Sequence, residues 1–335
     1  MKNKNFSRRN FLEKMILGGA TLGAINLIPN KLHGFSPNNL TNSSLKTIGI
    51  IGLDTSHSEI FAKMINEGEL KDRGYKVIVA YPHGSKDIPS ALNMKQDIIN
   101  NVQKLGVEIV NSIPELLSKV DYVLLESNDG KVHLEQAISV FKAKKPVFID
   151  KPLAATLKDV EQIIQHSKQN GTPFFSSSAL RYEQNVAEVV KGGIGKVTGA
   201  DVYTPAEIDP GHIDLAWYGI HGVEMLFTIM GQGCKSVRRV HTEGTDLLVG
   251  TWDDGRIGTV RGIRKGASNI AGIAFGESGI KQLGPFNTYF PLVEKILDFF
   301  DTGVAPIQPN ETLEIFRFMH AADKSKQQNG KEIII

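Results

Sequence analysis

Short apolar runs alternate with helical patterns through the first half of the chain. Between the runs, apolar residues recur at helical spacing, as at Ile60, Phe61 and Met64. Uninterrupted apolar runs of this length are typical of parallel strands that are buried on both faces. Strands that alternate with helices predict a doubly wound, parallel α/β sheet that binds ligands at the carboxyl ends of its strands. The runs lie at residues 47–52, 75–81, 107–110, 120–126 and 146–150.

The pattern changes in the second half, where strand-like segments follow one another with few helices between them. Helical patterns occupy residues 217–230 and 290–300. Consecutive strands predict an α+β domain with an open, mostly antiparallel sheet. We therefore expect a dinucleotide-binding domain of Rossmann type over 46–150 and an α+β substrate and oligomerisation domain over 151–335. The strand-like segments are 197–203, 236–241, 246–252 and 256–263, the last two joined by the hairpin turn Asp253-Asp254-Gly255.

The N-terminus has the pattern of an export signal. The sequence SRRNFL at residues 7–12 is close to a twin-arginine signal, and a weakly hydrophobic segment follows at 15–28. That segment is short for a membrane span, which needs about 20 apolar residues. We expect a twin-arginine signal over 1–30, a linker over 31–45, and export to the periplasm, with the signal either cleaved or retained as an anchor. The alternative is a chance Arg-Arg pair before an amphipathic helix.

Composition narrows the classes of partner. The formal net charge of +2 gives no reason to expect a nucleic-acid surface. The single cysteine, Cys234, rules out a disulfide within the chain and a cysteine-based zinc site. The histidines have no recognisable metal-ligand spacing, so we predict no metal site.

The turn after the first strand departs from the usual dinucleotide-binding pattern G-x-G-x-x-G. In GIIGLDTSHSEIF, residues 49–61, Gly49 and Gly52 are present, but Asp54 and His57 stand where the second and third glycines are expected. A carboxylate pointing at a pyrophosphate would repel it. We expect Asp54 to turn aside and cap the following helix, so that the phosphates contact Thr55, Ser56 and His57 at the helix N-terminus.

The end of the second strand leaves the form of the cofactor open. An acid usually follows this strand and holds the ribose hydroxyls of NAD. Here the sequence is AYPHGSKD, in which His83, Ser85 and Lys86 could accept the 2′-phosphate of NADP. NAD in a divergent site is equally tenable.

Two further motifs carry a resemblance to a known family. Asp150-Lys151-Pro152 ends the fifth apolar run, and ESNDGKVHLEQA follows the fourth. In this combination residues 46–330 resemble the glucose–fructose oxidoreductase / inositol dehydrogenase (Gfo/Idh/MocA) family. The resemblance implies an N-terminal Rossmann domain, a C-terminal open-sheet domain, and a catalytic or substrate-orienting role for Lys151 near the nicotinamide. On the cofactor side it implies Ser127, Asn128, His133, Asp150 and Pro152.

The family's second motif, D-x-x-x-H on a helix, is only half matched. His221 in WYGIHGVEML fits the histidine and would be the general base, but Trp217 stands at the aspartate position. Asp209, His212 or Asp214, just upstream, could replace the missing acid. Trp217 and the adjacent Tyr218 are candidate substrate contacts.

The function expected from these observations is an exported NAD- or NADP-dependent oxidoreductase that acts on a sugar, glycoside or polyol. Hydride would leave the carbinol carbon as a base removes the hydroxyl proton. The resemblance also implies a homo-oligomer. The alternative is a redox-inactive family member that binds a carbohydrate or a partner, with Trp217 as a stacking platform, or an enzyme that uses transient oxidation for glycoside cleavage or epimerisation.

Overall fold

The computed structural model describes residues 45–335. The signal expected over 1–30 and nearly all of the linker expected over 31–45 lie outside the described residues. Across 45–335, no helix combines the length and apolarity needed to cross a membrane.

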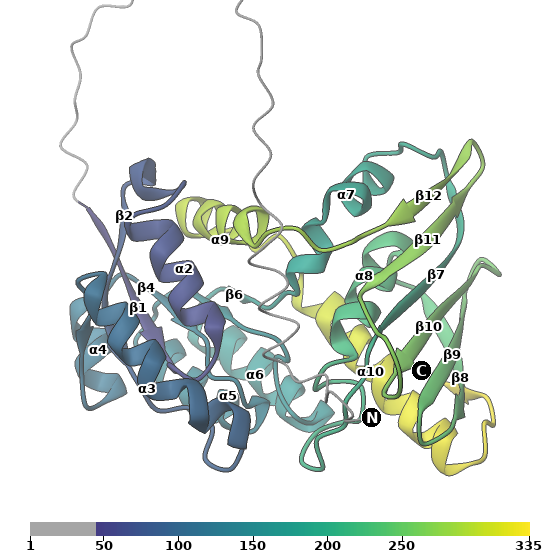
Figure 1. The fold of residues 1–335 in the computed structure, drawn as a ribbon, viewed down its shortest axis with the longest axis horizontal. Helices are drawn as coiled ribbons and strands as arrows, with labels where there is room; N and C mark the ends of the chain where they lie inside the picture. The colour runs from purple at the N-terminus through teal and green to yellow at the C-terminus, as the bar shows by residue number, and fades with distance from the viewer. Residues whose placement is uncertain (1–44) are drawn as a thin grey trace, which may run out of the picture.

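The N-terminal part is the predicted parallel sheet (Figure 1). Its six strands have the order β3-β2-β1-β4-β5-β6, which is the doubly wound order in which β1 lies between β2 and β4. The sheet continues past residue 150, because α6 and β6 complete it. The strands are β1 (Lys46–Ile51), β2 (Tyr75–Tyr81), β3 (Glu108–Ile109), β4 (Tyr122–Leu125), β5 (Val147–Ile149) and β6 (Phe174–Phe175). The helices are α2 (Ser56–Asn66), α3 (Pro89–Lys104), α4 (Ile113–Lys119), α5 (Gly130–Lys142) and α6 (Leu157–Asn170).

The C-terminal part is a second, mixed sheet with the order β12-β11-β7-β10-β9-β8-β13. All its pairs are antiparallel except β7 with β10. Helices α8 and α10 pack on this sheet, and α8 begins at Ile220 rather than at the predicted residue 217. The strands are β7 (Val197–Pro205), β8 (Cys234–His241), β9 (Thr245–Trp252), β10 (Ile257–Ile263), β11 (Ala271–Gly276), β12 (Gly279–Leu283) and β13 (Ile333–Ile334). The helices in this half are α7 (Gln184–Val190), α8 (Ile220–Met230), α9 (Phe290–Thr302) and α10 (Pro309–Gln327).

Helix α9 ties the two halves together. After β12 the chain crosses back, and α9 lies beside α2 of the parallel-sheet domain (Figure 1). Phe299 meets Phe175 of β6 edge to face, with ring centroids 5.2 Å apart. Arg73 pairs with Asp298 and Asp301, each at 3.0 Å. The segment just before α9 is thereby fixed against the carboxyl edge of the parallel sheet.

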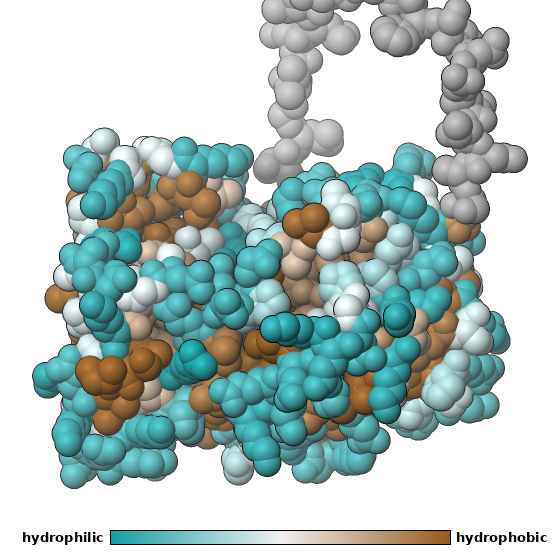
Figure 2. All heavy atoms as spheres, turned by 180° about the vertical axis from the view of Figure 1, so that it is seen from behind, coloured by the Kyte–Doolittle hydropathy of each residue, from teal (hydrophilic) through white to brown (hydrophobic). Residues whose placement is uncertain are grey.

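The outer face of the mixed sheet carries exposed apolar side chains. Seen from behind, hydrophobic residues reach the surface in patches on this domain, which lies at the left in Figure 2. Along β10, Ile257 points outward, whereas Gly258 and Val260 are buried against the helices. Alternation of this kind is expected of a sheet that helices cover on one face only.

Two glycines with positive φ give a matched test of the turn after β1. Gly52 has a φ of 92°, and a Cβ there would lie 2.5 Å from the backbone of Ser127. Gly74 has a φ of 76° with open space around it. We expect Gly74→Ala to lower the free energy of unfolding by about 1 kcal/mol, the cost of a left-handed backbone alone. Gly52→Ala should cost at least about twice as much, measured by chemical denaturation. Equal losses of unfolding free energy in the two variants would show that the backbone of Ser127 shifts to make room for the added methyl group.

Candidate active site

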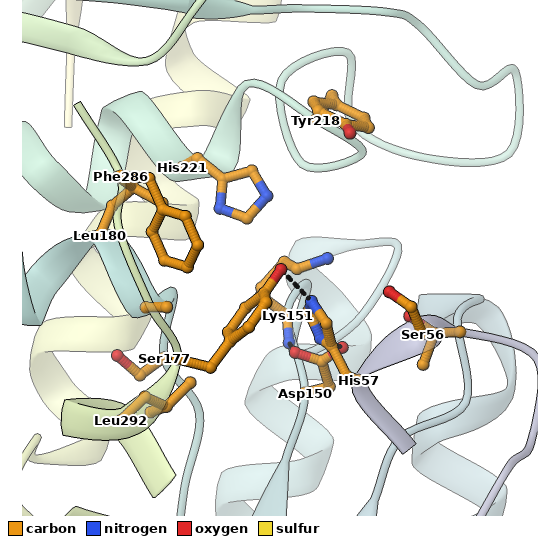
Figure 3. A pocket seen from close by; sticks show the side chains of 13 residues that line it. Ser56, His57, Asp150, Lys151, Ser177, Leu180, Tyr218, His221, Phe286 and Leu292 are labelled. Carbon is orange, nitrogen blue, oxygen red and sulfur yellow. Dashed lines mark hydrogen bonds and ion pairs between the residues drawn. The ribbon is translucent and has the colours of Figure 1, made fainter. Parts of the chain in front are cut away.

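A small pocket lies where the parallel sheet meets the C-terminal domain. Its volume is about 20 Å³, which is room for about one water molecule. Lys151 and His57 extend into it from the parallel-sheet domain, and His221 faces them from the opposite side (Figure 3). The lining residues are Thr55, Ser56, His57, Asp150, Lys151, Ser177, Ala179, Leu180, Tyr218, His221, Phe286, Tyr289 and Leu292.

Asp150 and Lys151 follow β5 and are both buried. One Asp150 oxygen lies 2.7 Å from His57 Nδ1, and the other accepts the backbone N–H of Lys151 at 2.8 Å. Burial alone would raise the pKa of Asp150, but the charges of His57 and Lys151 outweigh burial and hold that pKa well below its ordinary value. Asp150 is therefore an ionised anchor for the His57 ring and for the backbone N–H of Lys151.

His57 connects this anchor to a residue that the sequence did not suggest. Its Nε2 lies 3.0 Å from the hydroxyl of Tyr289, a hydrogen bond drawn as a dashed line in Figure 3. The imidazole also stacks on Phe61, with centroids 5.5 Å apart. Tyr289 immediately precedes α9, so it reaches the pocket only because α9 packs back on the first domain. Asp150, His57 and Tyr289 form a continuous hydrogen-bonded chain.

His221 lies in the first turn of α8, and Ser178 fixes its ring. Ser178 Oγ is 2.7 Å from His221 Nδ1. The backbone N–H of Ser178 donates to Glu224, one turn further along α8, at 2.9 Å. Burial raises the pKa of Glu224, and Arg181, 3.6 Å away, opposes that rise. The arrangement gives His221 a defined direction toward the pocket, which general base catalysis requires.

Glu126, at the end of β4, is a buried carboxyl group beside Asp150. Neither oxygen has a hydrogen-bond partner within residues 45–335. Burial raises the pKa of Glu126 well above its ordinary value, Asp150 raises it further, and Lys151 lowers it. Ligand atoms of His57, Glu126 and Asp150 lie within 4.8 Å of one another, as in some metal sites. The positive charge of Lys151 lowers the pKa of both carboxyl groups.

Several of the predicted cofactor residues shape the backbone around the pocket. Gly49 makes room for Leu116, which a Cβ would meet at 2.6 Å. Ser127 donates its hydroxyl to Gln136 at 2.8 Å. The ring nitrogens of His133 lie 2.6 Å and 3.2 Å from the carbonyl oxygens of Ser127 and Leu153, and the Lys151–Pro152 peptide is cis. These residues hold the loops after β4 and β5 in register.

The expectation that Asp54 caps the helix is wrong. The N-cap of α2 is Thr55, which makes no side-chain capping bond in the described structure. Asp54 instead accepts the backbone N–H groups of Ser85 at 2.5 Å and Asn128 at 3.0 Å. The carboxylate thus bonds to two backbone N–H groups of neighbouring loops and not to the N–H groups at the start of α2.

The structure does not bring His212 and Asp214 to the pocket. Asp214 pairs with Arg239 at 2.9 Å and Lys326 at 2.8 Å. Burial would raise the pKa of Asp214, but these cations lower it. His212 lies between Asp209, at 2.8 Å, and Asp129, at 3.3 Å. Both side chains belong to ion pairs outside the pocket, so neither replaces the missing acid.

Trp217 does not face the pocket either, whereas Tyr218 does. The indole is 8% exposed and packs in a small apolar cluster with Ile88 and Ala91 at the start of α3. His212 covers it, with ring centroids 5.0 Å apart. A ring held in this way offers no face to a sugar, so Trp217 is no stacking platform in this conformation.

Comparisons with known proteins agree with this architecture. Residues 46–177 match the family GFO_IDH_MocA, described as "Oxidoreductase family, NAD-binding Rossmann fold". The match covers the parallel-sheet part of the chain and is a similarity to this family. The chain is 32% identical over 163 residues to myo-inositol 2-dehydrogenase of Thermotoga maritima, which covers 44% of this chain and 47% of that protein. It is 26% identical over 97 residues to an uncharacterized oxidoreductase of Streptococcus pneumoniae, covering 28% of this chain and 26% of that protein. The alignments thus span about half or less of these curated relatives.

Solved structures show the same two-domain fold. Scyllo-inositol dehydrogenase from Lactobacillus casei, with bound NAD(H) and scyllo-inositol, superposes with a TM-score of 0.69 at 16% identity, covering 86% of this chain and 98% of that one. A probable dehydrogenase from Thermotoga maritima gives a TM-score of 0.70 at 21% identity over 86% and 98% of the two chains. At these identities the likeness establishes the fold, and it confirms the predicted fold class.

The raised pKa of Glu126 leads to a pH-dependent prediction. A carboxyl group whose pKa rises on folding contributes stability below its unfolded pKa and loses it as the pH rises through the folded pKa. Glu126→Gln removes that loss. The melting temperature of the variant relative to wild type should therefore increase between pH 5 and pH 8, by about 2 °C or more. Glu161→Gln, at an exposed site, is the control, and a difference for Glu126→Gln that does not vary with pH would contradict the assignment.

Proposed function

We propose that this protein is an NAD-dependent oxidoreductase that oxidises a carbinol of a polyol or sugar, with inositol-like cyclitols as the first substrates to test. The observation that carries the proposal is the pocket in which Lys151 and His221 face each other from different domains. The family of the N-terminal domain and the inositol dehydrogenases among the relatives support it. NAD, when bound, supplies the hydride acceptor.

The donors around the carboxyl edge of the parallel sheet fit a dinucleotide. Ser56 Oγ, Ser85 Oγ and Asn128 Nδ2 are buried and have no hydrogen-bond partner in the part of the chain that the structure describes. They follow β1, β2 and β4, so one donor comes from each strand next to the crevice where this fold binds dinucleotides. The N-terminus of α2 adds its dipole. Asp54 is the exception, because its carboxylate occupies the centre of this group.

The proposed chemistry uses three side chains of the pocket. Lys151 donates to the reacting oxygen, and Asp150 holds the backbone N–H of Lys151. His221 removes the hydroxyl proton, and its bond to Ser178 keeps the ring in position. Tyr289 contacts a second hydroxyl of the substrate, with its own hydroxyl oriented by His57.

Substitution of the two central residues tests this proposal. We expect Lys151→Met and His221→Asn each to lower kcat by about 10²- to 10⁴-fold, the usual contribution of a positioned acid or base. NADH formation at 340 nm with myo-inositol, scyllo-inositol and a panel of sugars is the assay, and NAD binding by calorimetry should persist in both variants. Lys158→Met, at an exposed position, should leave the rate unchanged. If wild-type protein binds neither NAD nor NADP, the redox function is wrong.

We also propose that a second copy of this chain covers the outer face of the mixed sheet. Ile257 and Ile280 point outward there with 54% and 70% of their surface exposed. Apolar side chains that cluster on an open sheet face are typical of interaction surfaces. Light scattering should give a mass above one chain for wild type, and Ile257→Lys with Ile280→Lys should shift it toward the monomer.

Export by the twin-arginine route is a further part of the proposal. The sequence SRRNFL at residues 7–12 supports it. Replacing Arg8 and Arg9 by lysine should retain the protein in the cytoplasm, as fractionation of the producing cells would show. Unchanged export would mean that another signal directs it.

A further inference from the structure

Asp54 stands where the dinucleotide-binding turn usually has its second glycine, the residue that lets backbone approach the pyrophosphate. Its side chain is almost fully buried. One carboxylate oxygen accepts the backbone N–H of Ser85 at 2.5 Å, and the other accepts the backbone N–H of Asn128 at 3.0 Å. Both carboxylate oxygens are thus engaged by backbone donors from other loops.

The position of these donors places the carboxylate across the end of β1. Ser85 belongs to the loop after β2, and Asn128 to the loop after β4, and β1 lies between these two strands. The connections reverse direction at this point of the sheet, which is where such folds bind their ligand. Asp54 therefore lies in the crevice that the phosphates of a dinucleotide would enter.

Gly84 shows how closely the chain surrounds this carboxylate. A Cβ at Gly84 would lie 2.6 Å from one oxygen of Asp54 and 2.7 Å from the other. Any side chain at position 84 would push the carboxylate out. Because Gly84 has no side chain, the Asp54 carboxylate can lie against its backbone. Glycines in the usual dinucleotide-binding turn let a bound phosphate approach the backbone in the same way.

The segment before α8 packs on the parallel-sheet domain near the start of α3. Trp217 and Tyr218 pack on Ile88 and Ala91 at the start of α3. The backbone N–H of Ile213 donates to Ala155 of the first domain at 3.0 Å. Asp54 itself is only 1% exposed, and burial strengthens the bonds of its carboxylate to the two N–H groups.

We propose that Asp54 is an internal occupant of the phosphate site, and that NAD binds only when this carboxylate leaves the N–H groups of Ser85 and Asn128. The inference rests on the proposed use of NAD. A phosphate placed beside the carboxylate of Asp54 would meet a like charge in a buried setting. The N–H groups that Asp54 now holds are the donors that an incoming phosphate would take over. Asp54 thus sets the affinity of this site for the cofactor.

The test compares NAD binding to apo protein by calorimetry in four forms. Asp54→Asn removes the charge and keeps one acceptor oxygen, and Asp54→Ala empties the cradle. Asp87→Asn is the matched control, because Asp87 is an exposed acid three residues beyond Gly84 that pairs with Lys131. We expect both Asp54 variants to bind NAD at least tenfold more tightly than wild type, and Asp87→Asn to stay within about twofold. Equal or weaker binding by the Asp54 variants would overturn the proposal.

Inorganic pyrophosphate separates this proposal from the proposed function. Asp54→Ala leaves two buried N–H groups without an acceptor, so its melting temperature should fall below that of wild type. Pyrophosphate should raise the melting temperature of Asp54→Ala and leave that of wild type unchanged. If pyrophosphate binds to the variants and NAD binds to no form, Asp54 is an internal occupant and NAD is not the cofactor. If neither pyrophosphate nor NAD binds to either Asp54 variant, the inference about Asp54 is wrong. If Asp54→Ala does not fold, the same measurements on Asp54→Asn decide the question.

Discussion

The buried pair of Asp150 and His57 is the interaction on which the pocket depends. It joins the end of β5 to the first turn of α2 through a 2.7 Å contact in the interior of the protein. One oxygen of Asp150 holds the backbone N–H of Lys151, and the other holds the imidazole of His57. The imidazole in turn holds Tyr289, so elements from both ends of the chain take their positions from one carboxylate.

The two departures from the glycine pattern act in a related way. His57 replaces a glycine and reaches across to the loop after β5, and Asp54 replaces another and reaches the loops after β2 and β4. In the usual turn these positions lack side chains, so backbone is open to the ligand. Here side chains link the carboxyl edge from β2 to β5. The carboxyl edge of the sheet is therefore both polar and buried. A ligand that enters it must either leave these side-chain hydrogen bonds intact or replace them with its own.

The sequence predicted what depends on local pattern. Apolar runs located the long strands, and the position of Lys151 after β5 placed it at the crevice. Tyr289 could not be found in this way, because it is 232 residues from His57 and reaches it through the packing of α9. Asp214 was expected in the pocket because it lies near His221 in the sequence. Its partner Arg239 lies two elements later, and no spacing rule links an acid in a loop to a buried arginine on a strand.

The proton that a carbinol oxidation releases has few places to go in this pocket. The charges of His57 and Lys151 outweigh burial and hold the pKa of Asp150 well below its ordinary value, so Asp150 is a poor proton acceptor. Glu126 is fully buried beside it, where burial and the charge of Asp150 raise its pKa well above the ordinary value. In the proposed reaction, Lys151 donates to the reacting oxygen. His221, which enters from the other domain with its ring fixed by Ser178, is the group that we propose to accept the proton. The proposed mechanism therefore does not need the motif's aspartate, which Trp217 replaces here.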